Sequence, residues 1–101
     1  MVKHVIIWRI KDEFSADEKA KIKKEIKESI EALNGKIPGL IEVKVNICPL
    51  PSSNAELILD SSFESEEALK VYATHPLHVA AANEKVRPFV TNKACMDYVA
   101  E

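Results

Sequence analysis

Apolar residues in the first eleven positions alternate with other residues in the manner of a β-strand. One side of that strand would carry Val2, His4, Ile6, Trp8 and Ile10. The other side would carry Lys3, Val5, Ile7, Arg9 and Lys11, and it is apolar at its centre and charged at its ends. Because successive strand residues point to opposite faces, the pattern predicts a strand over 2–11 that is covered on both sides at its centre.

The next segment repeats its apolar residues at helical spacing. Ser15 and Glu18 have the spacing of a capping box, in which each side chain accepts a hydrogen bond from the other residue's backbone. The predicted inner face carries Ala20, Ile22, Ile26, Ile30, Leu33 and Ile37. Interleaved lysines and glutamates fill the other face, a pattern typical of a solvated helix surface. Asn34-Gly35 is the expected left-handed stop.

Two strands are expected after the Pro38-Gly39 turn. Residues 40–48 alternate, and the predicted buried side carries Ile41, Val43, Val45 and Ile47. The loop Pro49–Asn54 contains two prolines, which interrupt a sheet ladder, so a new strand is expected over 55–63.

The C-terminal part predicts a broken helix followed by a strand. Ser65 would cap a helix over 66–74, with Ala68, Leu69, Tyr72 and Ala73 facing inward. Pro76 cannot lie inside a helix but suits the first position of a new one. We therefore expect a second helical segment over 76–86 and a last strand over 89–99.

The predicted order is β-α-β-β-α-β, which with right-handed crossovers gives an α+β, ferredoxin-like sandwich. Its four-stranded antiparallel sheet would have helices on one face, and residues 1–101 would form a single domain. The other sheet face keeps apolar side chains that nothing else in the chain covers. Because an exposed apolar face of that size usually belongs to an interface, we expect a homodimer through the open sheet face.

Composition excludes several classes of function. The chain has 101 residues, 47% of them hydrophobic and 30% charged, with a net charge of −2. No basic stripe or apolar run of membrane-spanning length is present, so neither nucleic acid nor membrane is an expected partner and a cytoplasmic location is expected. With only Gly35 and Gly39, the chain has no phosphate-binding or dinucleotide-binding glycine motif. No cofactor is expected.

Cys48 and Cys95 lack the close spacing of a zinc motif, so free, half-buried thiols on strands are expected. A disulfide would require neighbouring strands and oxidising surroundings. His4, His75 and His78 follow no spacing rule for a metal site either, and no metal is expected.

The most distinctive cluster of polar residues is His75-Pro76-Leu77-His78, which follows Tyr72 at the predicted helix break. Imidazole titrates near neutral pH, so such a cluster suits proton transfer as well as structural hydrogen bonding. His78 could act on a ligand, or it could bond a backbone carbonyl or Asp97 and hold the helix junction together. His75 precedes a proline and is therefore expected to be extended.

The chain resembles the stress-responsive A/B barrel domain proteins, which are dimeric α+β barrels. The specific part of the match runs from Phe63-Glu64-Ser65-Glu66-Glu67-Ala68-Leu69 through Tyr72-Ala73-Thr74-His75-Pro76-Leu77-His78. Further matches are the opening Val2–Ile6, the Ile37-Pro38-Gly39 turn, Val86-Arg87-Pro88 and Met96-Asp97-Tyr98. The resemblance implies a homodimer with a barrel built from two sheets.

One plant branch of that family looks like polyketide cyclases, which close a poly-β-keto acid without metal or cofactor. By that resemblance His78 would be the general base and Tyr72 would hold or polarise a carbonyl. His4 and Asp97 would be supporting polar groups. This chain departs from the pattern in the short, proline-rich loop Pro49–Asn54, which is expected to alter the rim of a cavity.

Three hypotheses for function follow. The first is a small-molecule binding protein with an apolar pocket between sheet and helices, lined by His4, Tyr72, His78 and Asp97. Trp8 and His75 are further candidate ligand contacts, although Trp8 also suits the core and His75 the helix junction. The second is a cofactor-free cyclase, isomerase or lyase that acts on an enolisable carbonyl compound, with His78 as base. The third is a structural, stress-associated dimer without a cavity.

Arg9 and Arg87 could each receive a ligand carboxylate, although a surface ion pair is the commoner role.

Overall fold

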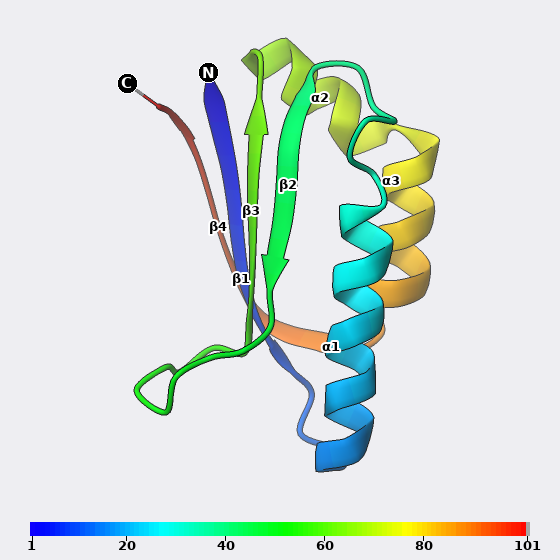
Figure 1. Ribbon diagram of the computed structural model, residues 1–101, viewed down its shortest axis with the longest axis vertical. Helices are drawn as coiled ribbons and strands as arrows, with labels where there is room; N and C mark the ends of the chain where they lie inside the picture. The colour runs from blue at the N-terminus through cyan, green and yellow to red at the C-terminus, as the bar shows by residue number, and fades with distance from the viewer. Residues whose placement is uncertain (101) are drawn as a thin grey trace.

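A computed structural model describes residues 1–100 as one four-stranded antiparallel sheet covered on one face by helices (Figure 1). The strands are β1 (Val2–Ile10), β2 (Leu40–Asn46), β3 (Leu57–Phe63) and β4 (Val90–Val99). The helical elements are α1 (Ala16–Glu31), α2 (Glu66–Thr74), α3 (Pro76–Ala81) and the π-helical turn η1 (Ala82–Val86). The strand order β2-β3-β1-β4 confirms the predicted ferredoxin-like fold.

Local signals in the sequence account for both long helices. Ser15 and Glu18 form the predicted capping box, in which the Ser15 Oγ accepts from the Glu18 backbone N–H at 3.1 Å. Ser65 caps α2 by accepting from the Ala68 N–H at 3.1 Å. The predicted left-handed position after α1 is Gly35, with φ of 78°.

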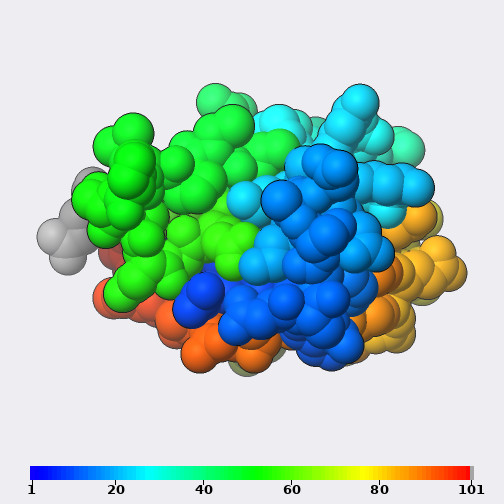
Figure 2. Space-filling view, turned by 90° about the horizontal axis from the view of Figure 1, so that it is seen from below, coloured from blue at the N-terminus to red at the C-terminus, as the bar shows by residue number. Residues whose placement is uncertain are grey.

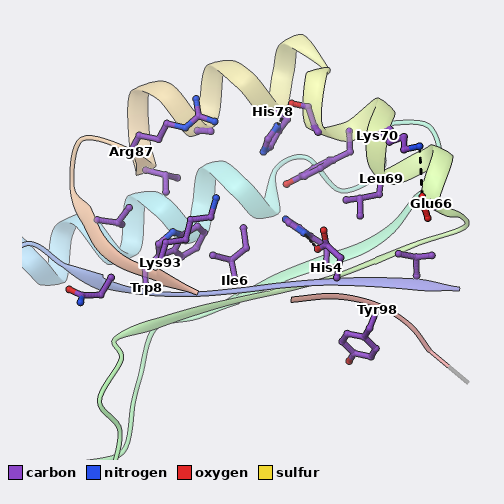
Figure 3. A pocket seen from close by; sticks show the side chains of 18 of the residues that line it. His4, Ile6, Trp8, Glu66, Leu69, Lys70, His78, Arg87, Lys93 and Tyr98 are labelled. Carbon is purple, nitrogen blue, oxygen red and sulfur yellow. Dashed lines mark hydrogen bonds and ion pairs between the residues drawn. The ribbon is translucent and has the colours of Figure 1, made fainter. Parts of the chain in front are cut away.

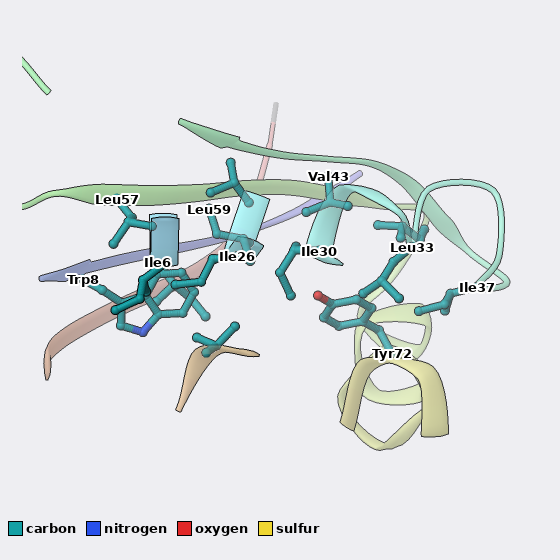
Figure 4. Packing of buried hydrophobic residues seen from close by; sticks show 14 of the residues in the cluster. Ile6, Trp8, Ile26, Ile30, Leu33, Ile37, Val43, Leu57, Leu59 and Tyr72 are labelled. Atoms are coloured by element: carbon teal, nitrogen blue, oxygen red, sulfur yellow. The ribbon is translucent and has the colours of Figure 1, made fainter. Parts of the chain in front are cut away.

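The core lies between the helical face of the sheet and the inner side of α1 and α2 (Figure 4). Ile22, Ile26 and Ile30 of α1 are buried as predicted, whereas Ala20 is exposed. Tyr72 enters this core from α2 and is 1% exposed. Val86 of η1 also belongs to this core.

The start of β2 differs from the predicted alternation. Leu40 is buried and Ile41 is 53% exposed, the reverse of the expected orientation of Ile41. The reason is a register shift between Leu40 and Glu42 opposite β3, which the alternation of residues 41–47 does not reveal. Val43 and Val45 are fully buried as expected.

The loop between β2 and β3 projects from one end of the sheet, and in the view from below it forms one side of the molecule (green) while α1 (blue) covers the middle (Figure 2). Cys48 lies in the segment after β2 and Cys95 lies on β4. Both thiols are free, and both are exposed rather than half-buried as expected. Among residues 1–100, no helix is long and apolar enough to cross a membrane.

Candidate functional site

A cavity of about 800 Å³ lies between the helical face of the sheet and the helices α2, α3 and η1 (Figure 3). Strands β1 and β4 form its floor. Four candidate residues from distant parts of the sequence line it together: His4, Tyr72, His78 and Asp97. The sheet and the broken helix therefore gather these side chains at one place.

The break at Pro76 explains how Tyr72 and His78 meet. At about 100° per residue, their spacing would place them about 120° apart around a straight helix. His75 is extended instead, with φ of −65° and ψ of 132°, and this redirects the chain between α2 and α3. The two rings consequently stack, with centroids 4.2 Å apart and planes inclined by 36°.

Surroundings favour the neutral form of His78. Partial burial is the largest influence and lowers the pKa of its imidazole; the hydrogen bond to the Ala73 carbonyl acts in the opposite direction, and the positive charge of Arg87 adds to the lowering. Its Nδ1 lies 3.3 Å from the Ala73 carbonyl oxygen. Because a carbonyl only accepts, Nδ1 carries the proton in this contact, which leaves Nε2 as the free basic nitrogen.

Tyr72 presents a buried hydroxyl that has no hydrogen-bond partner among residues 1–100. Burial raises the pKa of its phenol to about 12, so the group remains a protonated donor at neutral pH. The Tyr72 ring packs edge-on against Phe63 of β3, with ring centroids 5.0 Å apart. The centroid of the His4 ring, on β1, lies 6.3 Å from that of Tyr72. A buried hydroxyl without a partner is uncommon and requires an explanation.

His4 and Asp97 are directly opposite each other on β1 and β4. The His4 Nδ1 contacts the Asp97 carboxylate, which orients the imidazole. The backbone of His4 is also fixed, because the buried Ser61 hydroxyl donates to its carbonyl oxygen at 2.7 Å.

The other candidates have different surroundings. Trp8 is 5% exposed and belongs to the core, yet it also lines the cavity. His75 does not line the cavity; its Nδ1 accepts from the Leu77 N–H at 3.2 Å and caps α3. Arg87 lines the cavity and donates to Asn83 Oδ1, whereas Arg9 forms surface ion pairs with Asp12 and Glu56.

Sequence reasoning missed the residues that line the cavity at the start of β4, among them Asn92 and Lys93. Asn92 has a φ of 53°, in the left-handed region, close to a register shift in the β1–β4 pairing. Nothing in the local sequence distinguishes that irregularity from a regular strand. The expected effect of the loop Pro49–Asn54 on the rim is wrong, because none of its residues lines this cavity.

A sequence model of the stress-responsive A/B barrel domain matches residues 2–100. The chain belongs to this family. The match confirms the resemblance predicted from the segment Phe63–His78 and its flanking motifs. No match was found among curated proteins.

Several solved structures share the family's fold. A dimeric protein of unknown function with a ferredoxin-like fold from Bacteroides fragilis is 34% identical, with a TM-score of 0.87 over 96% of this chain and 93% of that one. A protein from Arabidopsis thaliana is 24% identical, with a TM-score of 0.79 over 100% and 96%. A hydroxynitrile lyase from Passiflora edulis is 19% identical, with a TM-score of 0.80 over 99% and 93%, and this likeness shows the fold alone.

Proposed function

We propose that this protein binds a small, largely apolar molecule with a carbonyl group in the cavity between sheet and helices. The observation that carries the proposal is the buried Tyr72 hydroxyl, which lacks a partner among residues 1–100 and belongs to a residue at the wall of a cavity of about 800 Å³. The hydroxyl is shielded from the cavity in this structure, so a carbonyl oxygen on a bound molecule would satisfy this donor once the Tyr72 ring turns toward the ligand. Leaving a buried donor unsatisfied costs about 1–3 kcal/mol, so a ligand that accepts its hydrogen bond gains affinity.

The remaining wall suits such a molecule. Aliphatic side chains from β1, α2 and η1, including Ile6, Leu69 and Val86, provide the apolar surface that buries most of a ligand. A few polar groups then fix its orientation. The cavity also argues against a purely structural dimer, for which we expected a filled interior.

A second candidate function is a cofactor-free cyclase, isomerase or lyase with His78 as general base. The neutral imidazole of His78, with Nε2 unengaged, favours it. In such a reaction Nε2 takes a proton from the carbon next to the carbonyl. The electron pair of the C–H bond forms the enolate double bond, and the carbonyl oxygen becomes the oxyanion to which Tyr72 donates.

We also infer that two copies pair through the open sheet face. Ile7, Met96 and Tyr98 lie on the face opposite the helices and are 37%, 65% and 40% exposed. Figure 3 shows the Tyr98 side chain on the far side of the sheet from His4, although residue 98 also lines the edge of the cavity. The Bacteroides fragilis relative is described as dimeric, which supports the same assembly here.

The binding proposal is tested with a panel of β-diketones, β-keto acids and aromatic aldehydes, by thermal shift and ligand-detected NMR. At least one compound is expected to bind wild type, and Tyr72→Phe should weaken it about tenfold by removing one hydrogen bond to a buried donor. Ser29→Ala is the control and should bind as wild type, since this hydroxyl donates to the Ile26 carbonyl on α1 and the residue does not line the cavity. Failure of the whole panel, or equal affinity for Tyr72→Phe, overturns the proposal.

Catalysis is tested separately from binding. For a compound that binds, exchange of its α-protons in D₂O is followed by NMR with wild type and with His78→Gln. Accelerated exchange that disappears in His78→Gln, with affinity retained, identifies His78 as the base. Exchange equal to the uncatalysed rate leaves the protein as a binder and rejects the enzyme hypothesis.

A further inference from the structure

Three side chains with metal-binding atoms meet at the β1–β4 edge of the cavity: His4, Cys95 and Asp97. Their ligand atoms all lie within 4.8 Å of one another. The Cys95 Sγ is 3.9 Å from the His4 Nδ1 and 3.7 Å from the Asp97 Oδ1. The His4 Nδ1 and the Asp97 Oδ1 are in direct contact with each other.

The pairing of β1 with β4 creates this cluster. Cys95 and Asp97 are two residues apart on one strand and therefore point to the same face. In the antiparallel register Asp97 is opposite His4, and Cys95 is opposite Ile6. Side chains that are opposite or diagonal across two strands are within reach of each other.

The spacing of the three atoms suits a tetrahedral ion. Bonds to zinc of about 2.3 Å for sulfur and about 2.0–2.2 Å for nitrogen and oxygen imply ligand atoms about 3.3–3.7 Å apart at the tetrahedral angle. The distance from Cys95 Sγ to Asp97 Oδ1 lies at the upper end of this range, and the distance to His4 Nδ1 exceeds it by a few tenths of an ångström. The His4 Nδ1 and the Asp97 Oδ1 are closer than this range, so one of the two side chains must turn away from the other to admit the ion.

We propose that His4, Cys95 and Asp97 form a zinc-binding site at the wall of the cavity. One sulfur, one nitrogen and one oxygen donor make a set that zinc accepts readily. Three protein ligands leave a coordination position for water or for a carbonyl oxygen, an arrangement that zinc adopts in catalytic sites rather than in structural ones. The proposal does not depend on which molecule the cavity receives.

Access for the ion is open. Cys95 is exposed, and the side chain of Asp97 is 47% exposed, so an ion from solvent reaches both without rearrangement of the core. The cluster lies on the helical face of the sheet, opposite the face proposed for the dimer. Pairing of two copies through that other face would leave the site accessible.

The test uses the untagged, reduced, full-length chain titrated with zinc sulfate by isothermal titration calorimetry, and with Co²⁺ as a spectroscopic probe. The expected result is one zinc per chain and a thiolate-to-cobalt charge-transfer absorption. Cys95→Ser and Asp97→Asn should each weaken zinc binding at least about tenfold, since even residues outside the direct ligand set change metal affinity by about 10–100-fold. Cys95→Ser should also lose the charge-transfer absorption.

Two matched variants separate this site from general metal binding. Cys48→Ser removes the other thiol of the chain, and His78→Gln removes a cavity histidine outside the cluster. Both should bind zinc as wild type does. Because Cys95 is exposed, Cys95→Ser should unfold at wild-type temperature without zinc. The proposal is overturned by absent or multiple weak zinc binding, by wild-type affinity in Cys95→Ser, or by an equal loss in Cys48→Ser.

Discussion

The imidazole of His78 stacks on the phenol of Tyr72 at a centroid distance of 4.2 Å, although a helix break separates the two residues. This contact places the imidazole of His78 against the ring of Tyr72, and both residues line one cavity while the Tyr72 hydroxyl itself is buried. It depends on the extended conformation of His75, whose own side chain caps α3 and stays outside the cavity. The junction residue thus positions two side chains that could act together on one ligand.

Tyr72→Phe is expected to leave the free energy of unfolding unchanged or to raise it by up to about 1 kcal/mol. The hydroxyl is buried without a partner, so its removal relieves a desolvation cost. Ser61→Ala is the contrasting variant, because that buried hydroxyl donates to the His4 carbonyl at 2.7 Å and its loss should cost about 0.5–1.5 kcal/mol. Urea unfolding of both variants measures the difference. A larger loss for Tyr72→Phe than for Ser61→Ala would contradict this account of Tyr72.

The lowered pKa of His78 predicts a pH dependence of stability. Burial is the main cause, and it places the folded-state pKa below the ordinary value of 6.5. Between these two values the unfolded chain binds more protons, so stability rises with pH in that window. The contribution of His78 to stability is therefore fully present above pH 6.5, and it is lost as the pH falls through the folded-state pKa.

Urea unfolding across the pH range of histidine titration, compared with His78→Gln, isolates this contribution. The difference between the two proteins should shrink as the medium becomes acidic. The NMR titration of the His78 ring gives the folded-state pKa directly. A midpoint at or above 6.5 would refute the prediction.

Local signals made much of the fold predictable from sequence. The capping box at Ser15, the cap at Ser65 and the break at Pro76 each act through neighbouring residues, and the helices begin or break where these signals lie. The ferredoxin-like order followed from the alternation of strands and helices. Features that depend on pairing between strands were less accessible, as the exposed Ile41 and buried Leu40 show.

The sequence was enough to name residues of the candidate site but not to predict how their side chains are arranged. The sequence singled out His4, Tyr72, His78 and Asp97, and all four line the cavity. Whether Tyr72 and His78 converge was open, because it depends on the dihedral angles at one junction. The proximity of Cys95 to His4 was missed, because it follows from the β1–β4 register across 91 positions of sequence.

Asn34 is expected to stabilise the edge of the sheet rather than only the end of α1. Its Nδ2 donates to the Val43 carbonyl at 2.9 Å and its Oδ1 accepts from the Val43 N–H at 2.8 Å, so the amide occupies the free side of edge strand β2. Asn34→Ala should cost about 1–3 kcal/mol by leaving both backbone groups unpaired. Chemical unfolding measures it, with Asn54→Ala in the exposed loop as control. Equal stability of the two variants would remove this role.

Met96→Lys is expected to convert the proposed dimer into a monomer. The substitution places a charge on the apolar sheet face, and a twofold axis would bring two such charges together, each uncompensated when buried. Val71→Lys is the control, since Val71 is 49% exposed but lies on helix α2, which covers the opposite face of the sheet. Light scattering after size exclusion reports the mass. A monomeric wild type, or a dimer that survives Met96→Lys, would argue against the sheet face as the interface.

Gly39→Ala should destabilise the protein more than Gly35→Ala, although the two glycines have similar backbone φ angles. Their φ angles are +81° and +78°, so each alanine carries a left-handed cost of about 1–2 kcal/mol. A Cβ on residue 35 meets nothing within 4 Å, whereas one on residue 39 would lie 2.5 Å from the Ala68 Cβ. This overlap should add about 1–3 kcal/mol, because α2 must move away from the turn.

The overlap between residues 39 and 68 is tested by a double-mutant cycle. Ala68→Gly alone should cost about 1 kcal/mol through its effect on helix α2. In the double variant, Ala68→Gly should recover the steric part of the stability lost through Gly39→Ala. The cycle should therefore show a coupling free energy between the two positions. The same cycle with Gly35→Ala should be additive, because residue 35 has no such neighbour. Equal losses for the two glycines, or an additive cycle at residue 39, would show that φ alone selects glycine at this turn.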